Sequence, residues 1–316
     1  MNPLAGVDAR QFRLVAMAMF TGTLRSGPGM LCLILTLLVG LGTTAVVLEP
    51  VELMQAVNQR EHLPADQEKV MKSLVVIATP LVSWLLAGHL DASAGHALTP
   101  AEQGDAERWA RYLLVERPEP LSAVYLIVCF SLPFLIALGA FDQVSGDIHA
   151  RRLRFLLPRA HRSTIFLGRA AGMMLFMGLL LALVVLVIAI YLASSLPLYP
   201  LASVAGWSAR CYLMMLAAAI PAVALCSLVS ASVDSAFASL ALCNAVFCVV
   251  PLAPLVIRLA SGTTWASVLT WLLPLPFQLE LFHFSFWQVA GAVLGCLAYA
   301  AGYLLIGLWI FARRDL

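Results

Sequence analysis

The sequence predicts an all-α integral membrane protein, and three observations support this fold class. Hydrophobic residues make up 62% of the 316-residue chain and charged residues only 11%, and the mean hydropathy is +0.93. Soluble domains contain about 45–50% apolar residues, so one water-soluble core cannot bury this much apolar surface. A helix needs about 20 mostly apolar residues to cross a bilayer. Six runs meet this length: residues 29–48, 121–141, 170–193, 208–230, 236–257 and 288–311.

The distribution of charged residues predicts six spans with both termini in the cytoplasm. Lys and Arg are retained on the cytoplasmic side of short loops. In this orientation the cytoplasmic segments, including the tail at 312–316, hold 11 of the 19 basic residues and 5 acids. The opposite side holds the other 12 acids. We therefore expect a multi-pass protein of the cytoplasmic membrane.

Residues 49–120 form a predicted extracytoplasmic insertion, which is too long for a plain hairpin between two spans. Within it, residues 73–90 are apolar but contain Pro80 and precede Asp91, so we expect a membrane-associated helix here rather than a span. If this segment did span, a seven-span topology with the N-terminus outside would follow. The charged parts form either a solvated cap or a docking surface for an extracytoplasmic protein.

Residues 1–28 predict an N-terminal interfacial amphipathic helix. Phe12, Val15, Met19 and Phe20 lie on one helical side, and the arginines lie elsewhere. Such a helix lies in the headgroup region of the lipid bilayer, with its basic residues facing the headgroups. A Ser-Gly-Pro-Gly sequence is then expected to break the helix before the first span.

Residues 258–287 predict a re-entrant hairpin of two short helices in the outer leaflet, because Pro274 and Pro276 interrupt a straight span. Glu280 and His283 lie one helical turn apart in this segment. They form either a gate or proton-sensitive pair or an ordinary interfacial pair.

Two polar residues inside the predicted spans are further candidates, because polar groups are rare at membrane depth. Arg210 either anchors the outer end of the fourth span in the headgroups or contacts the substrate. Asn244 either hydrogen-bonds a partner helix, for which a helix of a second copy is one candidate, or lines the pathway.

The connection between the second and third spans, residues 142–169, has the most unusual composition. It reads DQVSGDIHARRLRFLLPRAHRSTIFLGR and contains six arginines and two acids. Leu153, Leu156 and Leu157 follow helical spacing while the arginines occupy other faces, and Pro158 is expected to bend the helix. The result is a basic helical elbow. It either fixes the topology and contacts headgroups, or inserts its leucines into a groove of a cytoplasmic protein whose acids pair with the arginines.

This segment, with the phenylalanine before it, resembles the coupling segment of the type-2 ATP-binding-cassette permeases. That family's pattern runs approximately acidic-x-x-Ser-Gly-Glu-Ile-Glu-x-Gly-Thr-Leu-Arg-x-Leu-Leu, followed by a basic residue and Leu-Gly-Lys. Matching positions are Asp142, Ser145, Gly146, Asp147 for the glutamate, Ile148, Leu153, Arg154, Leu156, Leu157, Arg162, Leu167, Gly168, and Arg169 for the lysine. Arg151 and Arg152 replace the family's Gly-Thr, and its proline is shifted to Pro158. RPEPLSAVYL, SLVSASVDSAFASL, LLPLPFQLELF and FARRDL extend the resemblance over most of the chain.

The resemblance implies a six-span permease subunit of a bacterial inner membrane that works with two partners. One is a second permease copy, as a homodimer in preference to a heterodimer. The other is a cytoplasmic ATP-binding-cassette ATPase dimer, which the cytoplasmic coupling elbow engages. The implied ATPase-coupling residues are Asp142, Gly146, Asp147, Arg151, Arg154, Leu156, Leu157, Arg159 and Arg162.

The chain carries no motif for catalysis of its own. It has no GxxxxGK[ST] phosphate loop, and its two lysines, Lys69 and Lys72, lie in the insertion. The seven cysteines lack metal-ligand or redox spacing, and a net charge of +2 gives no nucleic-acid signature. We therefore expect neither enzyme activity nor a bound cofactor or metal, with ATP and Mg²⁺ held by the partner ATPase.

These observations predict the permease subunit of an ATP-driven exporter. The spans consist mostly of Leu, Val, Ala, Met and Phe, which favours a lipidic or amphipathic cargo. The alternative is mechanotransmission, in which the ATPase stroke remodels a protein docked on residues 49–120 without translocating cargo. An ion-coupled transporter would place ionisable residues near mid-bilayer, and the predicted spans contain almost none.

Overall fold

The computed structural model describes residues 8–60, 100–114, 117, 119–149, 161–195, 200–261 and 271–314. Within these ranges the chain is helical and contains no β-strand. The helices are α1 Ala9–Arg25, α2 Gly27–Arg60, α4 Pro100–Leu114, α5 Glu119–Ala140, α6 Ser145–His149, α8 Arg162–Ser195, α9 Leu201–Ser232, α10 Ala236–Ser261, α11 Leu275–Glu280 and α12 Phe286–Arg313. The predicted all-α fold class is confirmed for this part of the chain.

Among the described residues, five helices are long and apolar enough to cross a membrane. Their apolar segments are Gly27–Val46, Val124–Ile148, Arg162–Ser194, Leu201–Ser232 and Phe286–Arg313. They coincide with predicted spans one to four and six, and by length and composition the chain is a multi-pass membrane protein. The fifth predicted span, 236–257, falls in α10. The apolar part of α10 with described side chains is the shorter segment Ala236–Leu252, so a sixth span stays a prediction.

Helix bounds refine the predicted segments. α2 continues past the first span to Arg60, so the predicted insertion begins as a continuation of that helix. α8 already begins at Arg162, so the last part of the predicted elbow belongs to α8. Between α1 and α2, Ser26 is extended, and its Oγ accepts a hydrogen bond from Gly29 N at 3.1 Å. The predicted break before the first span is confirmed, whereas the helix predicted at 73–90 lies outside the described residues.

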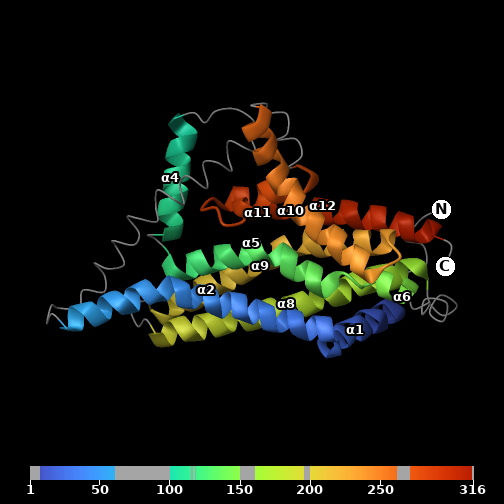
Figure 1. Ribbon diagram of the computed structural model, residues 1–316, viewed down its shortest axis with the longest axis horizontal. Helices are drawn as coiled ribbons and strands as arrows, with labels where there is room; N and C mark the ends of the chain where they lie inside the picture. The colour runs from blue at the N-terminus through green and yellow to red at the C-terminus, as the bar shows by residue number, and fades with distance from the viewer. Residues whose placement is uncertain are drawn as a thin grey trace.

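The bundle consists of α2, α5, α8, α9 and α12, which run side by side (Figure 1). α9 is central, because it contacts α5, α6, α8, α10 and α12. α4 lies across one end of the bundle and α6 lies at the other end (Figure 1). α9 therefore positions the polar groups at both ends.

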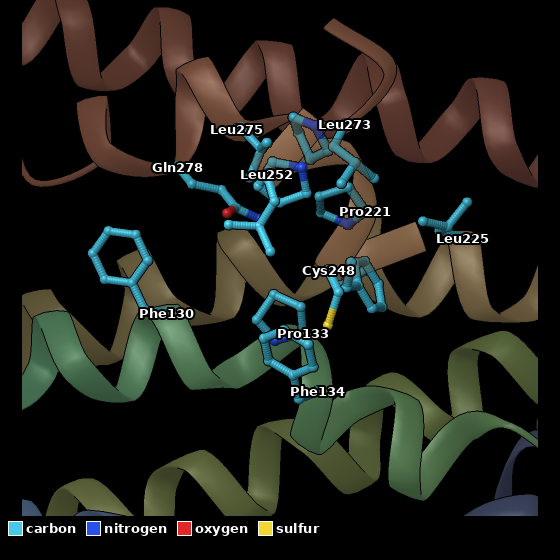
Figure 2. A pocket seen from close by; sticks show the side chains of 14 residues that line it. Phe130, Pro133, Phe134, Pro221, Leu225, Cys248, Leu252, Leu273, Leu275 and Gln278 are labelled. Atoms are coloured by element: carbon cyan, nitrogen blue, oxygen red, sulfur yellow. The ribbon is translucent and has the colours of Figure 1, made fainter. Parts of the chain in front are cut away.

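α10 is inclined to the bundle helices (Figure 1) and contacts α5 and α9. An apolar cavity of about 360 Å³ is lined by residues of these three helices, as Figure 2 shows. Its lining includes Phe130, Pro133 and Phe134 of α5, Pro221 and Leu225 of α9, Cys248 and Leu252 of α10, and Leu273, Leu275 and Gln278. Residues of the predicted re-entrant segment 258–287 thus close one side of the cavity, and Gln278 adds an amide to an otherwise apolar wall.

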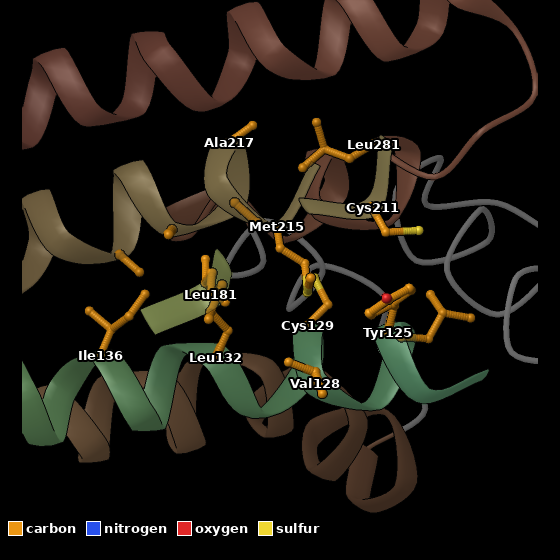
Figure 3. Close-up of a cluster of buried hydrophobic side chains, with 14 of the residues drawn as sticks. Tyr125, Val128, Cys129, Leu132, Ile136, Leu181, Cys211, Met215, Ala217 and Leu281 are labelled. Atoms are coloured by element: carbon orange, nitrogen blue, oxygen red, sulfur yellow. The ribbon is translucent and has the colours of Figure 1, made fainter. Parts of the chain in front are cut away.

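The hydrophobic core lies between α5, α8 and α9 (Figure 3). Tyr125, Leu132 and Ile136 of α5, Leu181 of α8 and Met215 of α9 are each at most 1% exposed. α9 is rich in alanine and serine, and such small residues let neighbouring helices approach closely. This close packing buries α9 more fully than the other four candidate spans.

α1 packs along α8 at two glycines. A Cβ added at Gly172 would lie 2.4 Å from the Ala16 carbonyl oxygen and 2.8 Å from Met19 Cβ. A Cβ at Gly168 would lie 2.9 Å from Val15 Cγ1. The apolar side predicted for the N-terminal helix therefore contacts α8, and its placement in the headgroup region stays a prediction.

We expect Gly172→Ala to destabilise the protein by about 1–3 kcal/mol, because the added Cβ overlaps the α1 backbone. Gly178→Ala in the same helix is the matched control, since its Cβ would meet nothing closer than 3.7 Å. The control is expected to be neutral or to gain up to about 1 kcal/mol from helix propensity. Thermal unfolding in micelles measures both, and equal stability of the two variants would contradict this packing.

Candidate functional site

The end of the bundle that carries α6 contains a set of polar contacts, which we call the elbow-end network. It joins the predicted coupling segment to α8, α9 and α12. Its members are Gln143, Ser145, Asp147, Arg162, Arg169, Ser227, Ser230, Asp234 and Arg314.

Arg169 joins α8 to the turn between α5 and α6. Its guanidinium donates to the Gln143 carbonyl and forms an ion pair with the Asp147 carboxylate. Arg169 is only 7% exposed, and a charge this buried requires partners of this kind. The contact holds α6 against the first turns of α8.

Two serines of α9 hold the same turn from the other side. Ser230 Oγ accepts hydrogen bonds from the backbone N–H groups of Val144 and Ser145, both at 3.0 Å. Ser227 Oγ donates to Gln143 Oε1 at 2.8 Å. Because buried N–H groups need acceptors, these serines fix the backbone that leads into α6. α6 is therefore attached to both α8 and α9.

Arg162 and Arg314 bind carbonyl groups at the ends of two long helices. Arg162 Nη1 donates to the carbonyls of Ala312 at 2.9 Å and Arg314 at 2.8 Å, at the end of α12. Arg314 Nη1 donates to the Ala231 carbonyl at 2.5 Å, at the end of α9, and its Nη2 pairs with Asp234. Cations stabilise the free carbonyls at helix C-termini. The ends of α8, α9 and α12 are thereby cross-linked.

The structure brings four of the predicted coupling residues to this end of the bundle. Gly146 N donates to the Asp142 carbonyl at 3.3 Å in the turn beside Asp147. Arg162 binds the end of α12, and its role in contacting the ATPase stays a prediction. The other predicted coupling residues lie outside the described residues: Arg151, Arg154, Leu156, Leu157 and Arg159.

The partners that hold α6 and the turn before it in place were not predicted from the sequence. Ser227 and Ser230 are one turn apart in an apolar helix, and this spacing is a signal of a polar stripe. Gln143 follows directly on Asp142, which was identified. The pairing of Arg314 with Asp234 joins residues far apart in the chain and has no local signal.

The opposite end of the bundle is organised by Arg210 of α9. Its Nη1 donates to Tyr112 Oη at 2.7 Å, and its Nη2 donates to the His283 carbonyl at 3.1 Å. Trp109 Nε1 donates to the Phe282 carbonyl at 3.1 Å. These bonds fix α4 and the connection between α11 and α12 on α9. Arg210 therefore joins three segments, and its contact with headgroups or substrate stays a prediction.

Glu280 and His283, predicted to act together, line one cavity of about 450 Å³. Its other lining residues are Asp105, Trp109, Phe284, Ser285 and Gln288. Burial raises the pKa of the Glu280 carboxyl and lowers the pKa of His283, although the Asp105 charge partly opposes the second shift. His283 Nδ1 accepts a hydrogen bond from Ser285 N at 2.9 Å, which requires this nitrogen to be unprotonated. Structure and burial both favour a neutral imidazole.

Asn244 lies apart from these groups. Its Nδ2 donates to the Leu240 carbonyl at 2.9 Å, one turn earlier in α10. The amide is thus used within its own helix. A hydrogen bond to a second copy stays a prediction.

Four prolines line the apolar cavity, and three of them lie inside three different helices. These three are Pro133 of α5, Pro221 of α9 and Pro251 of α10 (Figure 2 labels the first two). A proline inside a helix removes a hydrogen bond to the carbonyl four residues earlier and favours a kink. The three helices around the cavity therefore share a level at which each bends more easily.

No protein-family model and no curated protein matches the chain. Within the described ranges, no group of three or more His, Cys, Asp or Glu side chains is placed to hold a metal ion. The elbow-end network and the apolar cavity are the two candidate functional features.

We expect Arg169→Gln to destabilise the protein by about 2–3 kcal/mol, because it removes the charged donor that Asp147 and the Gln143 carbonyl share. A double-mutant cycle with Asp147→Asn isolates the pair in chemical unfolding experiments. Arg108→Gln is the control, since its pair with Asp105 is exposed and contributes at most about 1 kcal/mol. An Arg169→Gln variant as stable as the control would contradict the role of this buried pair.

We expect the stability contribution of His283 to fall as the pH is lowered through and below 6.5. The folded protein holds the pKa of His283 below this ordinary value, so the unfolded chain binds more protons in that window. Glu280 acts in the opposite direction: its raised pKa favours the folded state below 4.5, and this contribution is lost as the pH rises through the folded pKa.

The measurement compares thermal unfolding of the wild type and His283→Asn from pH 7.5 to 5. Asn keeps an acceptor for Ser285 N and does not titrate, and Glu280 is common to both proteins. The wild type should lose more stability than the variant on acidification. Parallel pH profiles would show that His283 is not held neutral.

Proposed function

We propose that the chain is the permease subunit of an ATP-driven exporter of the type-2 ATP-binding-cassette class. A separate ATPase dimer in the cytoplasm hydrolyses ATP and engages residues 142–169. Two permease copies form the membrane pathway. The resemblance of residues 142–169 to the coupling segment of that class implies the ATPase partner. The contacts of α6 with α8 and α9 support the proposal.

The observation that carries the proposal is the attachment of α6 to two membrane-spanning helices. Arg169 holds α6 on α8, and Ser230 holds the preceding turn on α9. A force that acts on α6 is therefore transmitted to α5, α8 and α9 together. A partner that binds two permease states with different affinity shifts their equilibrium by that difference.

Contacts between the ends of three helices support the proposal that the elbow and the C-terminal end of α12 lie on the same side of the membrane. Arg162 at the start of α8 binds the end of α12, and Arg314 binds the end of α9. Six spans place this end in the cytoplasm, together with the basic residues that the positive-inside rule assigns there.

The cavity between α5, α9 and α10 supports a lipidic or amphipathic cargo. Its wall is apolar apart from the Gln278 amide and the Cys248 thiol. Each of these three helices has a proline where it lines the cavity and can bend there. The cavity wall can therefore deform when α5 and α9 are displaced. We assign the cavity to the pathway side of the subunit.

Mechanotransmission is the second candidate, and α4 is the observation that favours it. α4 buries Trp109 and Leu113 on the bundle and exposes Arg108 and Arg111, so a charged surface lies across the end opposite α6. ATP-dependent movement of a fluorescent amphiphile in vesicles that contain only permease and ATPase would favour the exporter. ATPase activity that requires an added extracytoplasmic protein and moves no amphiphile would favour mechanotransmission.

We expect charge reversal of Arg154 and Arg159 to reduce copurification of a cytoplasmic Walker-motif ATPase at least about tenfold, because like charges then face its acidic groove. Arg162 is left unchanged, since its substitution would also release the end of α12.

The matched control reverses Arg108 and Arg111, two exposed arginines of α4 at the other end of the bundle. This control should retain the ATPase. Full retention by the Arg154 and Arg159 variant, or absence of any such ATPase from the wild-type preparation, would refute the proposed coupling.

A further inference from the structure

Two arginines at the α4 end of the bundle share the same pair of aromatic rings. Arg117 Cζ lies 5.0 Å from the ring centroid of Tyr112 and 5.1 Å from that of Trp207. Arg210 Cζ lies 5.8 Å and 5.6 Å from the same two centroids. The rings themselves are 5.9 Å apart in an edge-to-face arrangement. Two positive charges therefore lie next to one aromatic pair.

Neither guanidinium has a carboxylate partner among the described residues. Arg210 donates to Tyr112 Oη and to the His283 carbonyl, which are both uncharged acceptors. Arg117 Nε is buried and has no hydrogen-bond acceptor in the described part of the chain. A buried N–H without an acceptor is costly, and for a charged group the cost is larger. Two like charges beside one pair of rings also repel each other.

The aromatic pair is held in place, so this arrangement is preorganised. Tyr112 is 6% exposed and Trp207 is 3% exposed. Trp207 Nε1 donates to Ser122 Oγ at 3.1 Å. Tyr112 Oη accepts from Arg210, and its own hydrogen has no acceptor in the described ranges. The site thus offers two guanidinium groups and one hydroxyl donor, which is the donor set that binds an oxyanion.

The position along α9 places these donors at a membrane surface. Trp207 lies near the start of α9, and Ser230 of the elbow-end network lies near its end. A rise of 1.5 Å per residue separates the two residues by about 35 Å, close to the thickness of the hydrocarbon layer. Lipid phosphates are therefore expected at the level of Trp207.

We propose that Arg117, Arg210 and Tyr112 form a binding site for a phosphate group at the membrane surface opposite the elbow. The guanidinium groups pair with the phosphate oxygens, and Arg117 Nε and the Tyr112 hydroxyl gain the acceptors they lack. The phosphate belongs either to a phospholipid headgroup or to a free phosphate. The site is independent of the ATPase and of the cargo assigned above.

The test measures thermal unfolding of the purified full chain in uncharged micelles with four additions. They are short-chain phosphatidylglycerol, diacylglycerol of the same chain length, inorganic phosphate, and sodium chloride at matched ionic strength. We expect a phosphate-containing ligand to raise the Tm of the wild type by about 2–4 °C over its matched addition, because a ligand that binds the folded state stabilises it. Stabilisation by phosphatidylglycerol alone assigns a headgroup, and stabilisation by both assigns a free phosphate.

Arg117→Gln should abolish this shift and still fold, because Arg117 Nε has no hydrogen-bond acceptor in the described structure and the substitution removes only the contacts with the two rings. Arg108→Gln on α4 is the matched control and should retain the whole shift. Arg117→Lys, which keeps the charge, should retain part of it. The proposal is overturned if neither phosphate ligand stabilises the wild type, or if Arg117→Gln keeps the full shift.

Discussion

The contact on which the proposed mechanism depends is a buried arginine at the end of the membrane bundle. A charged guanidinium is costly to place among packed helices unless a carboxylate or other acceptors pair with it. Arg169 meets this condition with the Asp147 carboxylate and the Gln143 carbonyl. Satisfying the arginine therefore fixes α6 relative to α8, and the serines of α9 complete the attachment. The contacts that pair the buried charge of Arg169 are thus the same contacts that attach α6 to α8.

In the proposed mechanism, the elbow end of the bundle is stiff and the region around the apolar cavity is deformable. The polar cross-links of the elbow end join α8, α9 and α12, so these helices move as a group there. About halfway along, Pro133, Pro221 and Pro251 weaken three helices around one apolar cavity. In the proposed mechanism, a displacement applied at the elbow changes the shape of the cavity. At the end of the bundle opposite the elbow, hydrogen bonds of Arg210 and Trp109 hold α4 in place.

The membrane-spanning helices could be predicted because the length of an apolar run is a local property of the sequence. The break at Ser26 and the apolar side of α1 could also be predicted from turn residues and helical spacing. The sequence did not reveal that this side packs on Gly168 and Gly172, since small residues serve many purposes in membrane helices.

The candidate sites were only partly accessible to sequence reasoning. The elbow was found because six arginines stand out in an apolar chain, and Arg210 and His283 were found because polar residues are rare there. The partners of Arg162, Arg210 and Arg314 lie between 73 and 152 residues away in sequence. Such pairings depend on how the helices pack, which one sequence without relatives does not encode locally.

The most direct test of the central claim is the sidedness of the elbow in sealed cells. Cys248, the exposed cysteine, is first replaced by Ser, which leaves six buried cysteines. One new cysteine is then introduced at His161, which is exposed beside the start of α8, or at the exposed Arg108 of α4. The cells are then treated with a membrane-impermeant maleimide. The account predicts labelling of the Arg108 position in intact cells and of the His161 position only after permeabilisation. Labelling of His161 from outside intact cells would contradict a cytoplasmic coupling elbow.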